Sequence, residues 1–293
     1  MTRLLLFLAA MMAANIAVTA QIPTDLRRMG VNGKVKTISY KYTKFEMRYG
    51  KPVAQKPYVQ KREWFDKVGR VEKEHWLDEK SKITMLYAYR YDSEARVVEN
   101  EHELSGMVAA KSRTKFNYDS LGRLASEDKY SVPAGRLETK IIYDYDSVGR
   151  LASSIERLFY TSGGSTVHSR TTYVHTDTTY SGIEHQFAAD GWVAESRAKT
   201  WTTAGVLVSE RDTTFSHEGH VLSRFETLYN DRGWTIQRDH QSDYGAGPTS
   251  WVVTYRYTTD KNGNWITQEY FMLDRTTEGA VPELRGRVQR EFK

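Results

Sequence analysis

The sequence contains no cysteine, 6 prolines among its 293 residues and a net charge of only +5. Without cysteine there is no disulfide framework, no thiolate metal site, no cysteine nucleophile and no lipidated cysteine anchor. The charges alternate in sign along the chain, and the basic stripe typical of nucleic-acid binders is missing. Aromatic residues make up 12% of the chain, which is too many for a disordered protein.

The chain has one long apolar run, Leu4–Ala14, which follows Arg3 and ends near the small residues Val18-Thr19-Ala20. This arrangement is typical of a secretory signal peptide with cleavage after Ala20. The run is shorter than the ~20 residues needed to cross a bilayer. We therefore expect residues 1–20 to be a signal peptide and residues 21–293 to form a single domain that is periplasmic, on the outer surface or secreted. An uncleaved anchor is the alternative.

A repeated segment organises the mature chain. Residues 64–71, 89–97, 116–124 and 143–151 share the pattern aromatic-x-aromatic-Asp-x-x-Gly-Arg-aliphatic, in which one copy has Ala95 in place of glycine. The glycine or alanine positions are 69, 95, 122 and 149, so the intervals are 26, 27 and 27 residues. In the second half, glycines at 191, 205, 219 and 233 are 14 residues apart. The unit is one strand plus one turn, and two units make a hairpin.

The repeated Asp-x-x-Gly predicts a tight turn. The aspartate side chain accepts a backbone N–H two residues on, and glycine takes a positive φ that closes a hairpin with a bulge. Ala95 lacks that freedom and is expected to be the strained copy. The residues expected to shape the repeat turns are Asp66, Gly69, Asp92, Asp119, Gly122, Asp146, Gly149, Asp190, Gly191, Gly205, Gly219, Asp231, Gly233, Asp260 and Gly263.

The segments between turns alternate apolar and polar residues, as in Ile141/Tyr143/Tyr145, and this is the pattern of a strand. We predict an all-β fold, an antiparallel meander of repeated hairpins with about 16–20 short strands, in a single extended, twisted or rolled sheet. Lys34–Phe45 and Arg287–Phe292 would be the edges of this sheet. Unpaired edges invite pairing, so we expect either an edge-strand dimer or a closed sheet.

The unit Tyr-x-Tyr-Asp-x-x-Gly-Arg-Leu resembles the YD repeat of Rhs-type proteins. The match is good at 89–97, 116–124 and 143–151, partial at 64–71 and 255–265, and only periodic between 177 and 240. Large Rhs proteins wind such hairpins into a shell around a C-terminal toxin. This chain is too short for that shell, so the resemblance implies a small exported relative without a toxin domain. It implies a hairpin-repeat fold and no particular activity.

Few residues point to chemistry. His217 and His220 flank a predicted turn, where two histidines seldom converge on a metal. Asp260–Asn264 is similar to the start of a calcium loop, but Trp265 stands where that loop needs glycine. Arg70, Arg96, Arg123 and Arg150 follow the turn aspartates and are expected to pair with them locally. We therefore predict no catalytic residue, no metal and no cofactor.

Aromatic side chains are the most suggestive group. An aromatic strand face can bind a glycan or a peptide by stacking, whereas the simpler interpretation is that aromatic cross-strand pairs hold the sheet together. The residues that we select as candidates for ligand stacking are Trp76, Trp192, Trp201, Trp234 and Trp251.

The leading hypothesis is a non-enzymatic exported β-repeat protein that serves as a binding or structural module at the bacterial envelope. Its partner would be a glycan or an envelope protein, not nucleic acid. One alternative is a glycan-active hydrolase with two converging carboxylates near the break in the repeat, residues 160–190. Another is an outer-membrane barrel, against which charges on both faces of strands such as Arg123–Tyr130 argue.

Overall fold

The computed structural model describes residues 26, 29, 31, 34–105, 110–244 and 247–293, so the expected signal peptide lies outside the described residues. In the described part every regular element is a strand, and no helix there could cross a membrane. The 19 strands are β1 (Thr37–Arg48), β2 (Lys51–Ala54), β3 (Tyr58–Phe65), β4 (Val71–Leu77), β5 (Ile83–Tyr91), β6 (Val97–Leu104), β7 (Ala110–Tyr118), β8 (Leu124–Val132), β9 (Leu137–Tyr145), β10 (Leu151–Phe159), β11 (Ser165–His175), β12 (Thr179–Phe187), β13 (Val193–Thr202), β14 (Leu207–Phe215), β15 (Val221–Tyr229), β16 (Thr235–Ser242), β17 (Thr249–Thr259), β18 (Trp265–Asp274) and β19 (Glu283–Phe292).

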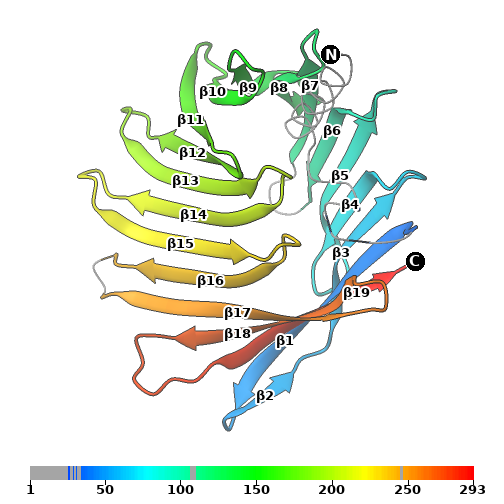
Figure 1. The fold of residues 1–293 in the computed structure, drawn as a ribbon, viewed down its shortest axis with the longest axis vertical. Coiled ribbons are helices and arrows are strands. Elements are labelled where there is room, and N and C mark those ends of the chain that lie inside the picture. Colours follow the sequence, from blue (N-terminus) through cyan, green and yellow to red (C-terminus); the bar gives the residue numbers. More distant parts are fainter. Residues whose placement is uncertain (1–25, 27–28, 30, 32–33, 106–109, 245–246) are drawn as a thin grey trace, which may run out of the picture.

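The sheet closes into an 18-stranded barrel because its first and last strands pair. β1 lies antiparallel to β19, with Ile38 opposite Phe292 and Lys44 opposite Gly286. On its other side β1 pairs with β3, and from β3 to β19 each strand pairs with the next (Figure 1). β2 branches from the ring and pairs with the end of β1, Phe45–Arg48. The expected antiparallel meander is confirmed.

Closure corrects one part of the predicted fold, because the sheet is not an extended or merely rolled one. The two expected edges, Lys34–Phe45 and Arg287–Phe292, pair with each other along six residue pairs, from Ile38 to Thr43 in β1, and a seventh pair joins Lys44 to Gly286. A sheet whose edges meet satisfies its N–H and C=O groups without a second chain. The two strands that were expected to pair with a second chain are therefore already paired with each other.

The repeat turns have the predicted geometry. Between β7 and β8, the Gly122 N–H donates to the Asp119 carbonyl oxygen at 2.9 Å. Asp119 Oδ1 accepts the backbone N–H groups of Leu121 and Arg123, both at 2.9 Å. Gly122 has a φ of 75°, and Ala95, the copy without glycine, is forced to a φ of 65°. The same side-chain acceptance recurs at Asp66, Asp92, Asp146 and Asp260.

Two of the predicted turn aspartates play a different part. Before Gly233, the side chain that accepts backbone N–H groups is Asn230, not Asp231. Asp190 lies directly before Gly191, in a turn whose first residue is Ala188. Only a residue three positions before the glycine can accept these N–H groups, so both aspartates lie in turns without holding them. Glycines 191, 205, 219 and 233 all have the expected positive φ.

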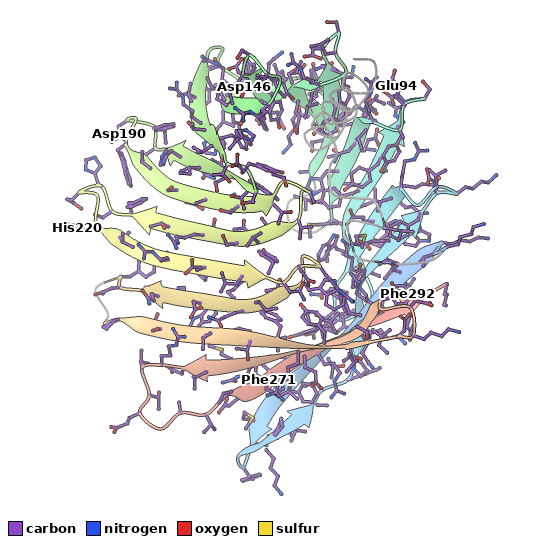
Figure 2. The ribbon with its side chains drawn as sticks, in the orientation of Figure 1. Glu94, Asp146, Asp190, His220, Phe271 and Phe292 are labelled. Carbon is purple, nitrogen blue, oxygen red and sulfur yellow. The ribbon has the colours of Figure 1, made fainter. Side chains whose placement is uncertain are left out.

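Because the strands alternate in direction, successive turns lie at opposite ends of the barrel. The turns after β5 and β9, which contain Glu94 and Asp146, belong to the end that we call the repeat-turn end. The turns after β12 and β14, which contain Asp190 and His220, belong to the other end (Figure 2). The 14-residue spacing in the second half therefore alternates between ends, whereas the 27-residue repeat returns to the same end.

Three of the four arginines that follow repeat turns, Arg70, Arg96 and Arg123, join two neighbouring repeats. Arg123 Nε donates to Asp119 Oδ2 at 2.7 Å, and its guanidinium carbon lies 4.3 Å from the ring centroid of Tyr145 in the next repeat. The Tyr145 hydroxyl donates to the Leu124 carbonyl oxygen at 2.8 Å. The predicted local Arg–Asp pairing is thereby confirmed. The Arg–Asp bond and the ring contact recur for Arg70 on Tyr91 and for Arg96 on Tyr118.

The two faces of the sheet differ in how their side chains meet. Tyr42 of β1 and Tyr270 of β18 lie on opposite sides of β19, yet their hydroxyl oxygens are 2.6 Å apart. Gly286 of β19 makes this contact feasible, because a Cβ there would lie 2.2 Å from the Tyr270 ring. Side chains two strands apart meet more readily on the concave side of a curved sheet than on its convex side. We call this concave side the inner face and the other the outer face.

The core lies at the repeat-turn end and on the inner face. Ile38, Phe65 and Val71 form one buried cluster, and Val97, Phe116 and Leu124 form a second. Leu26 and Val31 also belong to the first cluster. The other buried apolar side chains among the described residues are Phe45, Trp234, Val252, Val253 and Trp265. Many inner-face side chains, such as Tyr89 and Tyr143, are only partly buried.

The strained alanine gives a test of the turn geometry. Replacing Ala95 with glycine removes the left-handed penalty of an L residue and adds backbone entropy to the unfolded chain, so we expect a net gain of about 0.5–1 kcal/mol in stability. The midpoint of urea unfolding, followed by tryptophan fluorescence, would measure it. Ala198→Gly in β13 is the matched control and should destabilise by about 0.5–1 kcal/mol. A loss of stability in Ala95→Gly would contradict the positive φ.

Candidate functional site

The inner face carries partly buried pairs of tyrosine and glutamate that repeat around the ring. Tyr89 donates to Glu74 at 2.9 Å, and Tyr229 donates to Glu210 at 3.2 Å. Tyr143 donates in the same way to Glu127 at 2.5 Å. In each case the phenol reaches the strand before its own, so these pairs tie neighbouring strands together. Burial, which favours neutral phenols, raises the pKa of all three tyrosines.

A pocket of about 430 Å³ lies on the inner face over five consecutive strands, β18, β19, β1, β3 and β4. We call it the seam pocket, because it lies where the first and last strands of the ring meet. A bulge in β3 places Val59 opposite Lys41 and Lys61 opposite Tyr40, so Gln60 and Lys61 both line the pocket. Its lining is Met29, Tyr40, Gln60, Lys61, Glu63, Val71, Glu74, Trp76, Trp265, Gln268 and Val288.

A lysine held between two glutamates lies at the centre of the seam pocket. Lys61 Nζ is 2.5 Å from Glu63 Oε1 and 2.7 Å from Glu74 Oε2. The other oxygen of Glu63 accepts the Tyr40 hydroxyl at 2.7 Å, and the other oxygen of Glu74 accepts the Tyr89 hydroxyl. Every carboxylate oxygen of the pair therefore has a donor within the protein.

The electrostatics of this cluster keep Lys61 charged. Burial alone would lower the pKa of Lys61, but the adjacent carboxylates of Glu63 and Glu74 outweigh it, and the pKa of Lys61 is raised. The side chains of Glu63 and Glu74 are only 4% and 12% exposed. Two buried carboxylates this close together are stable as anions only beside a cation. Lys61 is that cation.

Aromatic rings form the walls of the seam pocket. Lys61 Nζ lies 4.9 Å from the ring centroid of Trp76. Trp265 is 7% exposed, and the guanidinium carbon of Arg290 lies 3.6 Å from its ring centroid. Arg290 also donates to the Tyr40 hydroxyl at 3.4 Å, while its Nε and Nη1 are buried and have no hydrogen-bond partner among the described residues. These atoms are covered by the rings and do not line the pocket.

The arrangement suits binding better than acid–base chemistry. A hydrolase of the kind considered above needs one carboxyl group free to donate a proton, whereas Glu63 and Glu74 are fully hydrogen-bonded and paired with Lys61. Within the break in the repeat, residues 160–190, the Glu184 carboxylate lies 3.8 Å from Arg197. In the described part of the chain no group of three or more His, Asp or Glu residues is placed to hold a metal.

The five tryptophans predicted for ligand stacking do not converge on one surface. Trp76 alone of the five lines the seam pocket. Trp201 stacks on Tyr180 with their centroids 5.0 Å apart, and Trp251 contacts His240. Trp234 is buried at 9% exposure, and Trp192 contacts His217 at the end opposite the repeat turns.

Sequence reasoning missed most of the pocket. Tyr40 of β1 lies beside Lys61 and Glu63 of β3, because these two strands pair directly. Trp265 belongs to β18, which reaches this site only when β19 pairs with β1 and the ring closes. Alternation within β3 does place Lys61 and Glu63 on one face, and alternation in the next strand puts Glu74 and Trp76 together. If the register between β3 and β4 had been known, it would have placed Glu63 opposite Glu74, with Lys61 beside them. The alternation within each strand could be predicted from the sequence, but this pairing between strands could not.

The outer face is charged at the middle of many strands. Ion pairs there join neighbouring strands all around the ring. They include Arg113–Glu101 at 2.8 Å, Lys140–Asp128 at 3.2 Å, Arg211–Glu226 at 2.7 Å and Arg287–Glu269 at 2.6 Å. The side chains of these pairs are partly exposed, so each pair contributes little to stability.

No protein-family model matches the chain, and a search of curated proteins finds no relative. Among solved structures it is similar to a porin-like protein from Bacteroides uniformis (10% identity, 92% of this chain and 98% of that chain, TM-score 0.41). It is also similar to a porin-like protein from Bacteroides vulgatus (10% identity, 88% and 98%, TM-score 0.32). A structure of TcdB2-TccC3-Cdc42 matches 83% of this chain and 14% of that chain (11% identity, TM-score 0.26). The resemblance to YD-repeat proteins stays a prediction.

The role of Lys61 can be tested by removing its charge. Lys61→Met leaves two buried carboxylates without their cation, so we expect a loss of about 3 kcal/mol in stability. The double variant Lys61→Met/Glu74→Gln should recover more than half of that loss, because one uncompensated charge is gone. Lys41→Met removes an exposed pair with Glu291 and should cost less than about 0.5 kcal/mol. Equal urea midpoints for the two lysine variants would contradict the cluster.

Proposed function

We propose that this protein is an exported, closed β-barrel that works in water and binds a small polar ligand in the seam pocket, without chemical turnover. The observation that carries the proposal is the seam pocket itself. It is a concave site of about 430 Å³ on the inner face, lined by Trp76, Trp265 and a few fixed polar groups. That volume lies within the range of about 300–1,000 Å³ usual for small-molecule sites.

The preorganised polar cluster supports binding rather than a purely structural role. Lys61, Glu63 and Glu74 are fixed by mutual contacts and by two phenols, and this leaves a rigid wall beside the indole of Trp76. Rigid aromatic and hydrogen-bonding groups lower the entropy that binding must overcome. A scaffold that only needed stability could replace such a charged cluster with apolar side chains at little cost.

The outer face supports a barrel that is surrounded by water. Arg113 and Glu101 lie near the middle of β7 and β6, where a lipid-facing strand would have to be apolar. An arginine or lysine facing lipid at mid-depth costs about 2–4 kcal/mol, and the outer face carries many of them. The apolar run at Leu4–Ala14 supports export of this barrel from the cytoplasm.

A ligand screen tests the proposal. Residues 21–293 would be purified and their thermal unfolding measured against a panel of oligosaccharides, short peptides, nucleotides and fatty acids. A ligand at 100 times its Kd adds about 2.7 kcal/mol of stability, so it should raise the melting temperature by several degrees. Trp76→Ala should abolish that shift, and Trp192→Ala, which changes an indole outside the pocket, should keep it. A shift that survives Trp76→Ala would place the ligand elsewhere and contradict the proposal.

A second candidate function is an outer-membrane barrel, and full closure of the sheet favours it. Bacterial outer-membrane barrels have an even number of antiparallel strands between about 8 and 26, and this ring has 18. Fractionation of cells that express residues 1–293 separates the two candidates. Recovery in the soluble exported fraction supports the binding barrel. Recovery in the outer membrane, with a band whose gel mobility changes on heating, would support the second candidate.

A further inference from the structure

The charges of the seam pocket cancel within the protein. Glu63 and Glu74 contribute two negative charges, while Lys61 and the adjacent Arg290 contribute two positive ones. Each carboxylate oxygen already accepts a hydrogen bond, and Lys61 already donates to both carboxylates. Arg290 is held against Trp265 and Tyr40, away from the pocket lining. A ligand therefore meets no unpaired charge at this site.

The groups left to contact a ligand are neutral. Trp76 is partly exposed and offers an indole, and the lining includes the carboxamides of Gln60 and Gln268. Gln268 Nε2 donates to the Tyr257 hydroxyl at 2.6 Å, so its carbonyl oxygen remains as an acceptor. Gln60 has no side-chain hydrogen bond to any residue that the structure describes. Carboxamides both donate and accept, which suits the hydroxyl groups of a polyol.

Side chains from five neighbouring strands line the pocket, with an aromatic residue on each of the outer two, Trp76 on β4 and Trp265 on β18. At about 4.8 Å between neighbouring strands, β4 and β18 lie about 19 Å apart along the sheet. This separation exceeds the width of a single pyranose ring. The apolar faces of sugar rings stack on indoles, and their hydroxyls take the hydrogen bonds that an amide pair offers.

On the basis of the function proposed above, we propose that the seam pocket binds an uncharged oligosaccharide. An anionic ligand would need a cation that is free to bind it, and Lys61 is already bound to two carboxylates. A cationic ligand would have to displace Lys61 from both Glu63 and Glu74. A neutral chain of sugar rings requires neither, since it uses the indole of Trp76 and the two carboxamides.

The test is calorimetric titration of residues 21–293 with four saccharides at 50 and 300 mM NaCl. The probes are cellotetraose and chitotetraose (N-acetylated) as neutral chains, trigalacturonate as an acidic one and the deacetylated chitosan tetramer as a cationic one. We expect a neutral chain to bind with less than a twofold change in Kd between the two salt concentrations, because no counterions are released. Trp76→Ala should weaken it at least tenfold, Trp76→Phe should restore part of the loss, and Trp192→Ala should leave Kd unchanged.

Three outcomes would overturn this inference. Binding of only the acidic or the cationic probe, with a Kd that rises with salt, would leave the proposed function intact and change the ligand class. If none of the four saccharides binds, but another class of compound in the thermal panel binds through Trp76, the proposed function also stays intact and the ligand class changes. Failure of every compound in both experiments, with a folded protein, would overturn the proposed function as well.

Discussion

The pairing of β1 with β19 is the contact on which the rest of this structure depends. In a meander of hairpins, each strand between the first and the last forms backbone hydrogen bonds with two neighbours. The first and last strands would each keep a row of unpaired backbone groups. Here those two rows satisfy each other along seven residue pairs. Closure also makes one side of the sheet concave, and that concavity brings Tyr42 to Tyr270 and forms the seam pocket.

The repeat contributes a different kind of stability, which is local and renewed every 27 residues or so. A turn aspartate fixes its own loop, the following arginine pairs with that aspartate, and the same arginine lies on a tyrosine of the next repeat. In the next repeat, His175 stands at the position that Tyr145 occupies in the repeat before it. The His175 imidazole lies 2.7 Å from the Leu151 carbonyl oxygen, just as the Tyr145 hydroxyl bonds that of Leu124. Repeat proteins owe their stability to such neighbour contacts. In this chain the final neighbour of the last repeat is the first strand.

Much of the fold followed from spacing alone. The Asp-x-x-Gly turns, the strands between them and the strained Ala95 could be predicted, because each depends on residues close in sequence. Closure could not, since the alternation of Tyr40 and Tyr42 marks a face without saying what lies opposite. The choice of tryptophans was only partly useful for the same reason. Trp76 lies in the seam pocket, but Trp265, which was not among the five selected, joins the lining of that pocket only after the ring has formed.

The position of the pocket has a consequence for how the chain acquires it. The contact between Lys41 and Glu291 joins residues 250 positions apart, and contacts between residues so distant in sequence are the slowest to form during folding. The repeats between them can form successively as the chain emerges, whereas the seam must wait for the last strand. The pocket is thus complete only in a full-length, closed molecule. A chain that lacks its C-terminal strand would keep most of its repeats and lose the site.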